Sequence, residues 1–293
     1  MIYIVLTVFT SVILLIAFKL FEKYQINTFA AILINYLVAC VTGTIVLNVS
    51  ISLSELFEYK WIWICLPLGA LFILIFYLIS LTAQKISVSV ASMANKLSFV
   101  MPVIYSIVML NDPLNTLKFT SVVLALIAVY LATKSASGSN ASGSSFYLLP
   151  VLVFIGSGLI DVSLNLAKAH YLTNSKEEAL FTVCTFFTAF CIGLIIVSFQ
   201  FIRNWASAKA NYLKIRNLIG GIALGIPNFF SIFFIFKSLS TSQFKSSQIF
   251  PVLNLSNVVL ATTCGYLMFN EKISRTNFVG ILLAVASIIL ILL

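Results

Sequence analysis

A lysine interrupts the apolar and small residues of the run MANKLSFVMP, residues 93–102. If this run is a membrane helix, an ammonium group near its centre costs roughly 2.5–3.5 kcal/mol, so Lys96 should face a cavity or a partner. Ser92, Asn95 and Ser98 recur at steps of three and four residues and therefore share one helical face. This combination suits the binding of an anionic group, such as a carboxylate, by Lys96 and its polar neighbours.

A second polar stripe lies further along the chain. Asn254 and Asn257 stand 159 residues after Asn95 and Ser98, again within an apolar run. We predict that both stripes line one substrate-binding site. The alternative is that these small polar residues join transmembrane helices through interhelical hydrogen bonds.

A third stripe contains an acidic residue. In GSGLIDVSLNLAKAHYL, residues 156–172, the side chains of Ser157, Asp161 and Asn165 recur at four-residue spacing. Asp161 is predicted to lie deep in the bilayer, where charged groups are rare and usually paired. Its functional interpretations are a counter-ion for Lys96 or a proton-coupling carboxylate, and the structural alternative is a hydrogen-bonded residue that steadies its own helix. Asp161 and Asn165 complete the predicted binding set.

The sequence offers no constellation for catalysis or metal binding. It has one histidine and no paired catalytic acids, and its five cysteines lack metal-ligand spacing and are expected to be small packing residues. Asp112 and Glu271 precede the fifth and tenth apolar segments, where an acid favours the positive N-terminus of the following helix. We therefore predict no enzymatic activity, no cofactor and no catalytic or metal-binding residue.

The elements that must position these residues are apolar helices. The chain has 293 residues, of which 61% are hydrophobic and 9% charged, and its mean hydropathy is +1.12. Its apolar runs do not alternate as the strands of a β-barrel would. We predict an all-α integral membrane protein with ten transmembrane helices, near 2–21, 28–48, 61–82, 87–110, 117–133, 146–170, 178–201, 217–240, 246–269 and 276–293.

A linker divides these helices into two sets of five. Residues 134–145, KSASGSNASGSS, have the Gly/Ser-rich composition of a flexible linker. The repeats are 1–133 and 146–293, and a shift of 159 residues aligns their last two helices without a gap. Because each repeat has an odd number of helices, the second must enter the membrane from the opposite side. We therefore predict inverted repeats, which secondary transporters use to build a site at the repeat interface.

The ends of the two halves resemble a known family. LMFNEKISRTNFVGILLAVASIILIL, residues 267–292, resembles the end of an EamA repeat, with Glu271, a turn and a Gly-containing last helix. MLNDPLNTLKFTSVVLALIAVYLA, residues 109–132, is a weaker copy, with Asp112 and Ser121 where the family usually has Glu and Gly. The chain is similar throughout to ten-helix members of the drug/metabolite transporter superfamily with two EamA-type domains. The resemblance implies a central cavity lined largely by the third, fourth, eighth and ninth helices, and alternating access.

We therefore expect a multi-pass secondary transporter, an exporter or exchanger of a small metabolite, in the cell (plasma or inner) membrane. Its partners are the substrate and the lipid bilayer, with a proton or counter-substrate as coupling partner. The net charge of +9 does not indicate nucleic-acid binding, because no loop is long enough for a basic domain. A passive channel and a signalling scaffold remain alternatives, and an intramembrane enzyme is a weaker one.

The orientation of the chain stays open. The basic loop RNWASAKANYLKIR, residues 203–216, would lie in the cytoplasm by the positive-inside rule, which places both termini outside. The resembled family implies the reverse, with both termini in the cytoplasm.

Overall fold

The computed structural model describes residues 2–48, 56–109, 116–135, 145–241, 246–271 and 274–292, and within these ranges it contains helices and no strand. The predicted all-α class is confirmed for this part of the chain. Residues 136–144 of the predicted linker lie outside it. The elements are α1 (Ile2–Lys23), α2 (Thr28–Leu47), α4 (Ile62–Lys85), α5 (Val88–Lys96), the 3-10 turn η1 (Leu97–Phe99), α6 (Val100–Met109), α7 (Thr116–Ser135), α8 (Ser145–His170), α9 (Ser175–Arg203), α10 (Trp205–Tyr212), α11 (Ile215–Thr241), α12 (Ser246–Phe269) and α13 (Arg275–Leu292).

Many of these helices can cross a membrane by length and composition. Among the described residues, five helical stretches are long and apolar enough, namely Ile2–Lys23, Thr28–Leu47, Ile62–Lys85, Lys176–Arg203 and Ile215–Ile235. Shorter apolar stretches lie in α7, α8, α12 and α13. The chain is therefore a multi-pass integral membrane protein, and the count of ten crossings stays a prediction.

The chain divides into two compact units. Unit 1 comprises Met1–Leu20, Leu78–Val162 and Phe230–Leu293, and unit 2 comprises Phe21–Tyr77 and Ser163–Phe229. The division passes through α1, α4, α8 and α11. Each unit therefore contains segments from both predicted repeats, whose equivalence stays a prediction.

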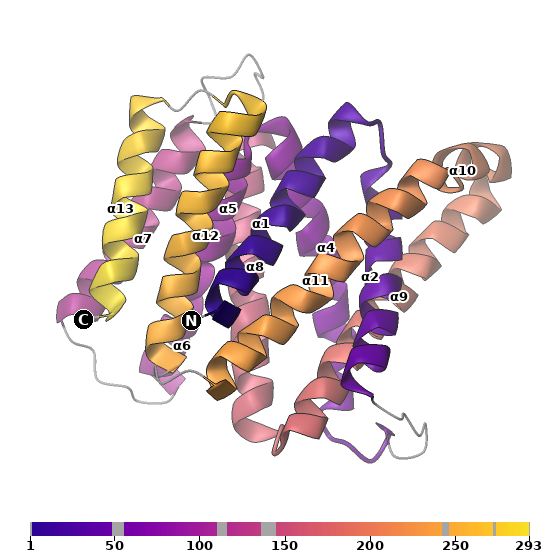
Figure 1. The fold of residues 1–293 in the computed structure, drawn as a ribbon, viewed down its shortest axis with the longest axis horizontal. Helices are drawn as coiled ribbons and strands as arrows, with labels where there is room; N and C mark the ends of the chain where they lie inside the picture. The colour runs from indigo at the N-terminus through magenta and orange to yellow at the C-terminus, as the bar shows by residue number, and fades with distance from the viewer. Residues whose placement is uncertain are drawn as a thin grey trace. The chain divides into compact units, whose positions relative to one another are not determined.

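Unit 1 is built around two antiparallel helix pairs. Ser121, near the start of α7, bonds to Ser287, near the end of α13, and Figure 1 shows these helices side by side. α5 and α12 are also antiparallel, because Ser89 at the start of α5 contacts Glu271 just after the end of α12. The helices share an apolar core made by Val90, Met93, Leu97, Val100, Ala125, Ala128, Phe154, Val258, Ala284 and Ile288.

Unit 2 is held by close crossings at small residues. A Cβ atom at Gly69 in α4 would lie 2.8 Å from the backbone nitrogen of Ala189 in α9. A Cβ atom at Gly225 in α11 would lie 2.8 Å from the backbone oxygen of Asn35 in α2. Glycine lets these backbones approach, as is common in membrane helix packing, where no hydrophobic effect drives helices together.

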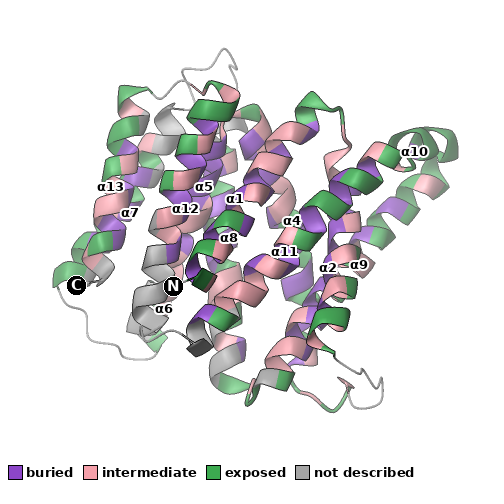
Figure 2. Ribbon diagram, viewed as in Figure 1, coloured by how far each residue is buried: buried purple, intermediate pink, exposed green. Residues whose placement is uncertain are grey.

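Each helix buries one face and exposes another, and Figure 2 shows buried and exposed residues interspersed along α9 and α11. Several exposed residues are large and apolar: on α9, Ile195, Phe199 and Ile202 are 69%, 68% and 84% exposed. A contiguous apolar face of this kind indicates a nonaqueous neighbour, which for a membrane protein is lipid.

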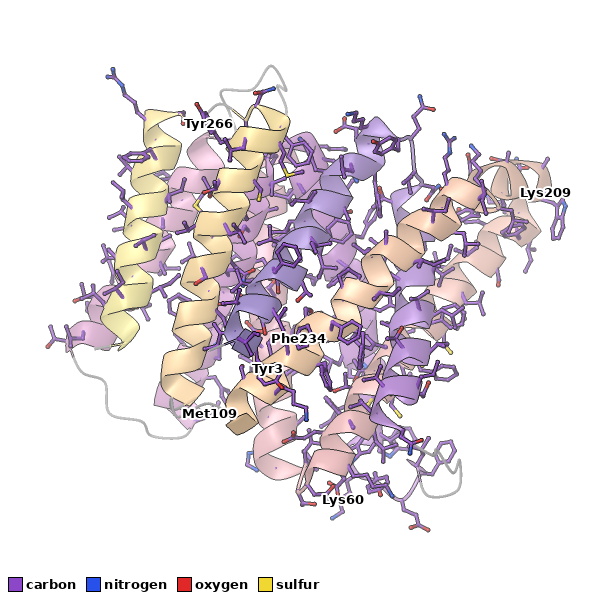
Figure 3. The ribbon with its side chains drawn as sticks, in the orientation of Figure 1. Tyr3, Lys60, Met109, Lys209, Phe234 and Tyr266 are labelled. Atoms are coloured by element: carbon purple, nitrogen blue, oxygen red, sulfur yellow. The ribbon has the colours of Figure 1, made fainter. Side chains whose placement is uncertain are left out.

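A short helix, α10, lies in the basic loop 203–216, where the sequence predicted only a connection. Asn204 caps it by accepting a hydrogen bond from the backbone N–H of Ser207 at 3.1 Å. The Tyr212 hydroxyl then donates to Oε1 of Gln200 in α9 at 2.7 Å, which fixes α10 against the preceding helix. In Figure 3, Lys209 of this loop and Lys60, just before α4, lie at opposite ends of unit 2.

Candidate substrate-binding site

The predicted helix over 87–110 is interrupted where its chemistry is concentrated. α5 ends at Lys96, residues Leu97–Phe99 form a 3-10 turn, and α6 resumes at Val100. The expectation of one continuous helix is therefore wrong. Pro102 contributes to the break, because proline has no backbone N–H to donate to the carbonyl of Ser98, four residues earlier. It is not sufficient by itself, since Pro67, Pro150 and Pro227 lie inside continuous helices. The corresponding helix of the second half, α12, is continuous despite Pro251.

The break gives Lys96 a favourable location. Lys96 is the last residue of α5, whose carbonyl end carries partial negative charge. Its side chain is partly exposed, and so is that of Asn95. Broken helices whose ends face a charged group are the way that many transporters form a site at the membrane midplane.

Ser98 joins the break to α8. Its hydroxyl, on a residue that is 0% exposed, lies 3.1 Å from Oδ2 of Asp161 and 2.6 Å from the backbone oxygen of Asn95. Gly158, one turn before Asp161, makes this approach possible, because a Cβ atom there would meet the side chain of Met101 and lie 3.3 Å from the backbone oxygen of Ser98. The structure thus brings Ser98 and Asp161 of the predicted set together, and Asn95 contributes its backbone oxygen.

Lys96 and Asp161 are electrostatic neighbours. Within the residues that the structure describes, however, they form no direct ion pair. In this state Lys96 and Asp161 therefore interact through their charges without direct contact. The group that forms a hydrogen bond with Asp161 is the hydroxyl of Ser98.

The asparagines of α12 lie beside α5. The Ser92 hydroxyl donates to the backbone oxygen of Asn257 at 3.4 Å, and the Asn257 amide nitrogen donates to the backbone oxygen of Leu253 at 2.8 Å. Asn257 is 1% exposed, and its side-chain oxygen has no hydrogen-bond partner among the described residues. Such an atom is costly to leave unpaired, so it is suited to a ligand that donates a hydrogen bond. Asn254 is partly buried.

The remaining predicted residue is Asn165, whose backbone lies in α8 but whose side chain is outside the described part. Ser157 was left out of the predicted set although it shares the face of Asp161. It is 4% exposed, and its hydroxyl also lacks a partner among the described residues. The four-residue spacing to Asp161 is the signal that could have identified it.

Glu271 acts on a different helix from the one predicted. Its carboxylate accepts hydrogen bonds from the backbone N–H of Val88 at 2.7 Å and from the Ser89 hydroxyl at 3.3 Å, at the start of α5. The prediction that it serves the following helix, α13, is wrong. The free N–H groups of the first turn of α5 attract the acid, and Gly265 leaves room for the carboxylate because it has no side chain.

The described residues contain no group of three or more His, Cys, Asp or Glu side chains placed to hold a metal ion.

Comparison with known proteins gives a family match for part of the chain. Residues 174–293 match the EamA-like transporter family. The match covers less than half of the chain, and the class of function that it indicates is a membrane transporter of the drug/metabolite type.

Two relatives extend the similarity beyond that segment. An uncharacterized protein of Haemophilus influenzae is 25% identical over 291 residues, which span 97% of this chain and 95% of the relative. Protein PecM of Dickeya dadantii is 23% identical over 238 residues, or 79% of this chain and 74% of the relative. A solved crystal structure superposes with a TM-score of 0.52 over 97% of each chain at 12% identity, which shows a shared fold.

Proposed function

We propose that this chain is a secondary transporter of a small metabolite, an exporter or exchanger that works by alternating access in a bacterial inner membrane. The observation that carries the proposal is the helix interruption at Leu97–Phe99, which brings the Ser98 hydroxyl to the Asp161 carboxyl group within an apolar bundle and follows directly on Lys96. Irregular backbone at membrane depth is tolerated where it is buried in protein or lines a water-filled cavity. The family match of residues 174–293 supports the same class.

The helix pairs support ten crossings in two inverted repeats. Under the shift of 159 residues, α5 and η1–α6 together correspond to α12, and α7 corresponds to α13. Each corresponding pair runs antiparallel, as two copies related by inversion would. α4 of the first half crosses α9 of the second half, and α11 of the second half crosses α2 of the first half. These two crossings would be equivalent if the halves are repeats.

The proposed substrate has an anionic group and at least one hydrogen-bond donor. Lys96 would receive the anionic group, because an ammonium with no direct ion pair can supply a charge-assisted hydrogen bond. Asn257 would accept from a donor through its unpaired side-chain oxygen. Asn95, Ser98, Asn254 and Asp161 would form the rest of the site, and Asn165 stays a candidate from the sequence alone.

The test begins with a thermal-shift screen of a metabolite panel on the purified protein, because a ligand of the folded form raises its melting temperature. Stabilising metabolites are then assayed for saturable flux in proteoliposomes. Lys96→Met should lower kcat/KM for flux on the order of tenfold or more, the loss of one charge-assisted contact. Lys60→Met, which removes an exposed lysine, should leave flux unchanged.

Flux that rises linearly with concentration would indicate a passive channel instead. Absence of flux for every stabilising metabolite would contradict transport. A Lys96→Met protein with the wild-type rate and affinity would remove Lys96 from the binding site.

A further inference from the structure

The Ser98 hydroxyl has two oxygen neighbours but carries one proton. Its oxygen lies 2.6 Å from the backbone oxygen of Asn95 and 3.1 Å from Oδ2 of Asp161. A backbone carbonyl can only accept a hydrogen bond, and a serine that bonds back to the third preceding carbonyl is common in helices. The shorter contact therefore takes the hydroxyl proton. Ser98 then faces Asp161 with its lone pairs, and a hydrogen bond between these two oxygens needs a proton on the carboxyl group.

The surroundings of Asp161 fit a neutral carboxyl group. Within the part of the chain that the structure describes, two groups act on the Asp161 carboxyl group. Lys96 of α5 is charged but makes no direct ion pair with it, and Ser98 of η1 is polar and uncharged. No other charged side chain among the described residues acts on this carboxyl group. A carboxylate removed from water without a close partner is costly, and such groups commonly keep their proton.

We propose that Asp161 is a proton-binding site. In the state described, its carboxyl group carries a proton and donates it in a hydrogen bond to Ser98. Asp161 releases this proton when Lys96 loses the anionic group and interacts with the Asp161 carboxylate instead. On release, the carboxyl O–H bond breaks and the proton passes to water. The resulting carboxylate attracts the Lys96 ammonium. A proton on Asp161 and an anionic group on Lys96 thus stabilise each other, and this coupling is reciprocal.

This inference rests on the proposed transport function for its role and refines it. If a proton and an anionic group occupy the site together, they cross together. An inward proton gradient opposes one-way export of such a pair. Of the two modes proposed above, the coupling therefore favours exchange.

The proton can be tested without knowing the substrate. Dicyclohexylcarbodiimide adds to protonated carboxylic acids in apolar surroundings, and the modified peptide is identified by mass spectrometry. Asp161 of the intact protein in lipid nanodiscs should be labelled at acidic pH, with labelling lost as the pH rises above a midpoint. Glu271 is an internal comparison, because it accepts hydrogen bonds from donors such as the Val88 N–H and should label weakly. Asp161→Asn should abolish the labelled peptide.

Three variants test the direction of the hydrogen bond and the coupling to Lys96. Ser98→Ala removes the acceptor of the Asp161 proton and should lower the midpoint by about 0.5 to 1 pH unit. Ser98→Thr keeps the hydroxyl and should retain the wild-type midpoint, which separates this effect from misfolding. Lys96→Met removes the charge that favours the carboxylate and should raise the midpoint by roughly one unit.

A Ser98→Ala midpoint that rises would show that Ser98 donates to an ionised Asp161, and it would overturn the proposal. So would the absence of Asp161 labelling in folded protein at acidic pH, or a midpoint that Lys96→Met leaves unchanged. Because labelling needs no flux, failure of the transport proposal would appear in the proteoliposome assay alone.

Discussion

Ser121 and Ser287 exchange hydrogen bonds across the α7–α13 contact. The Ser121 hydroxyl donates to the backbone oxygen of Ser287 at 2.8 Å, and the Ser287 hydroxyl donates to the backbone oxygen of Ser121 at 2.7 Å. Both residues are 0% exposed. A reciprocal pair of this kind fixes the position of one helix along the other, so the two serines set the register of the antiparallel pair.

Replacing either serine by alanine should therefore destabilise the protein modestly. Interhelical hydrogen bonds in membranes are worth about 0.6 kcal/mol on average and roughly 1.7 at most. Ser121→Ala and Ser287→Ala should each lower the melting temperature in nanodiscs. Thr120→Ala is the matched control and should have little effect, because among the described residues that hydroxyl bonds only to the backbone oxygen of Thr116 in its own helix. Equal effects at Ser121 and Thr120 would contradict the register role.

Adding one methyl group at the close crossings of unit 2 should cost more. Gly69→Ala and Gly225→Ala each place a Cβ atom 2.8 Å from a backbone atom of the neighbouring helix, so a helix must move, at about 1–3 kcal/mol. Gly220→Ala is the control, because its Cβ atom would approach the side chain of Ile26 no closer than 3.1 Å. Thermal unfolding compares the three variants. A Gly220→Ala protein as unstable as the other two would contradict crossing distance as the cause, because alanine raises helix propensity equally at all three positions.

The Glu271 carboxylate and Gly265 should be energetically coupled. Glu271→Ala leaves the Val88 N–H without its acceptor and should cost about 1–3 kcal/mol. Gly265→Ala should also destabilise the wild-type protein, since its Cβ atom would meet the carboxylate. In a Glu271→Ala background the same methyl group has room, so its cost should fall by at least about half. Additive losses in the double mutant would show that the carboxylate does not occupy this space.

Two cysteines introduced at opposite ends of unit 2 would determine the orientation in the membrane. Ser207 and Glu58 are both exposed, in the α9–α11 loop and before α4 respectively. If the basic loop 203–216 is cytoplasmic, Ser207→Cys in intact cells should react only with membrane-permeant thiol reagents, whereas Glu58→Cys should also react with impermeant ones. The reverse pattern would place both termini in the cytoplasm. Because the five native cysteines lie in helices, the parent protein without added cysteine supplies the background.

Hydrophobic runs predicted the helices well, because lipid offers no hydrogen-bond partners. The backbone N–H and C=O groups of an apolar membrane segment must therefore bond to each other, which a helix allows. Within the described residues, every predicted apolar segment is occupied by helix. The break in the run 87–110 was not predicted, because Asn95 and Ser98 were interpreted as polar positions on one face of a continuous helix. Pro102 was the available signal. α10 was not predicted because WASAKANY is too polar for a membrane segment. Asn204, a typical N-cap residue, was the available signal for this helix.

The contacts made by the candidate site residues could not be predicted from the sequence. Charge alone paired Asp161 with Lys96, whereas the structure bonds Asp161 to Ser98, because which side chain reaches the carboxyl group depends on how α8 packs on η1. Glu271 was assigned to the next helix along the chain, yet it bonds to Val88, 183 residues away. Such contacts need the tertiary arrangement, which residue spacing does not contain.

The 3-10 turn between Lys96 and Val100 is wound more tightly than the helices on either side. A 3-10 segment rises about 2.0 Å and turns about 120° per residue, against about 1.5 Å and 100° in an α-helix. Conversion of Leu97–Phe99 to α-helical winding would therefore shorten this segment by about 1.5 Å and rotate α6 against α5 by about 60°. A change confined to three residues would thus rotate all of α6 relative to the face of α5 that carries Lys96.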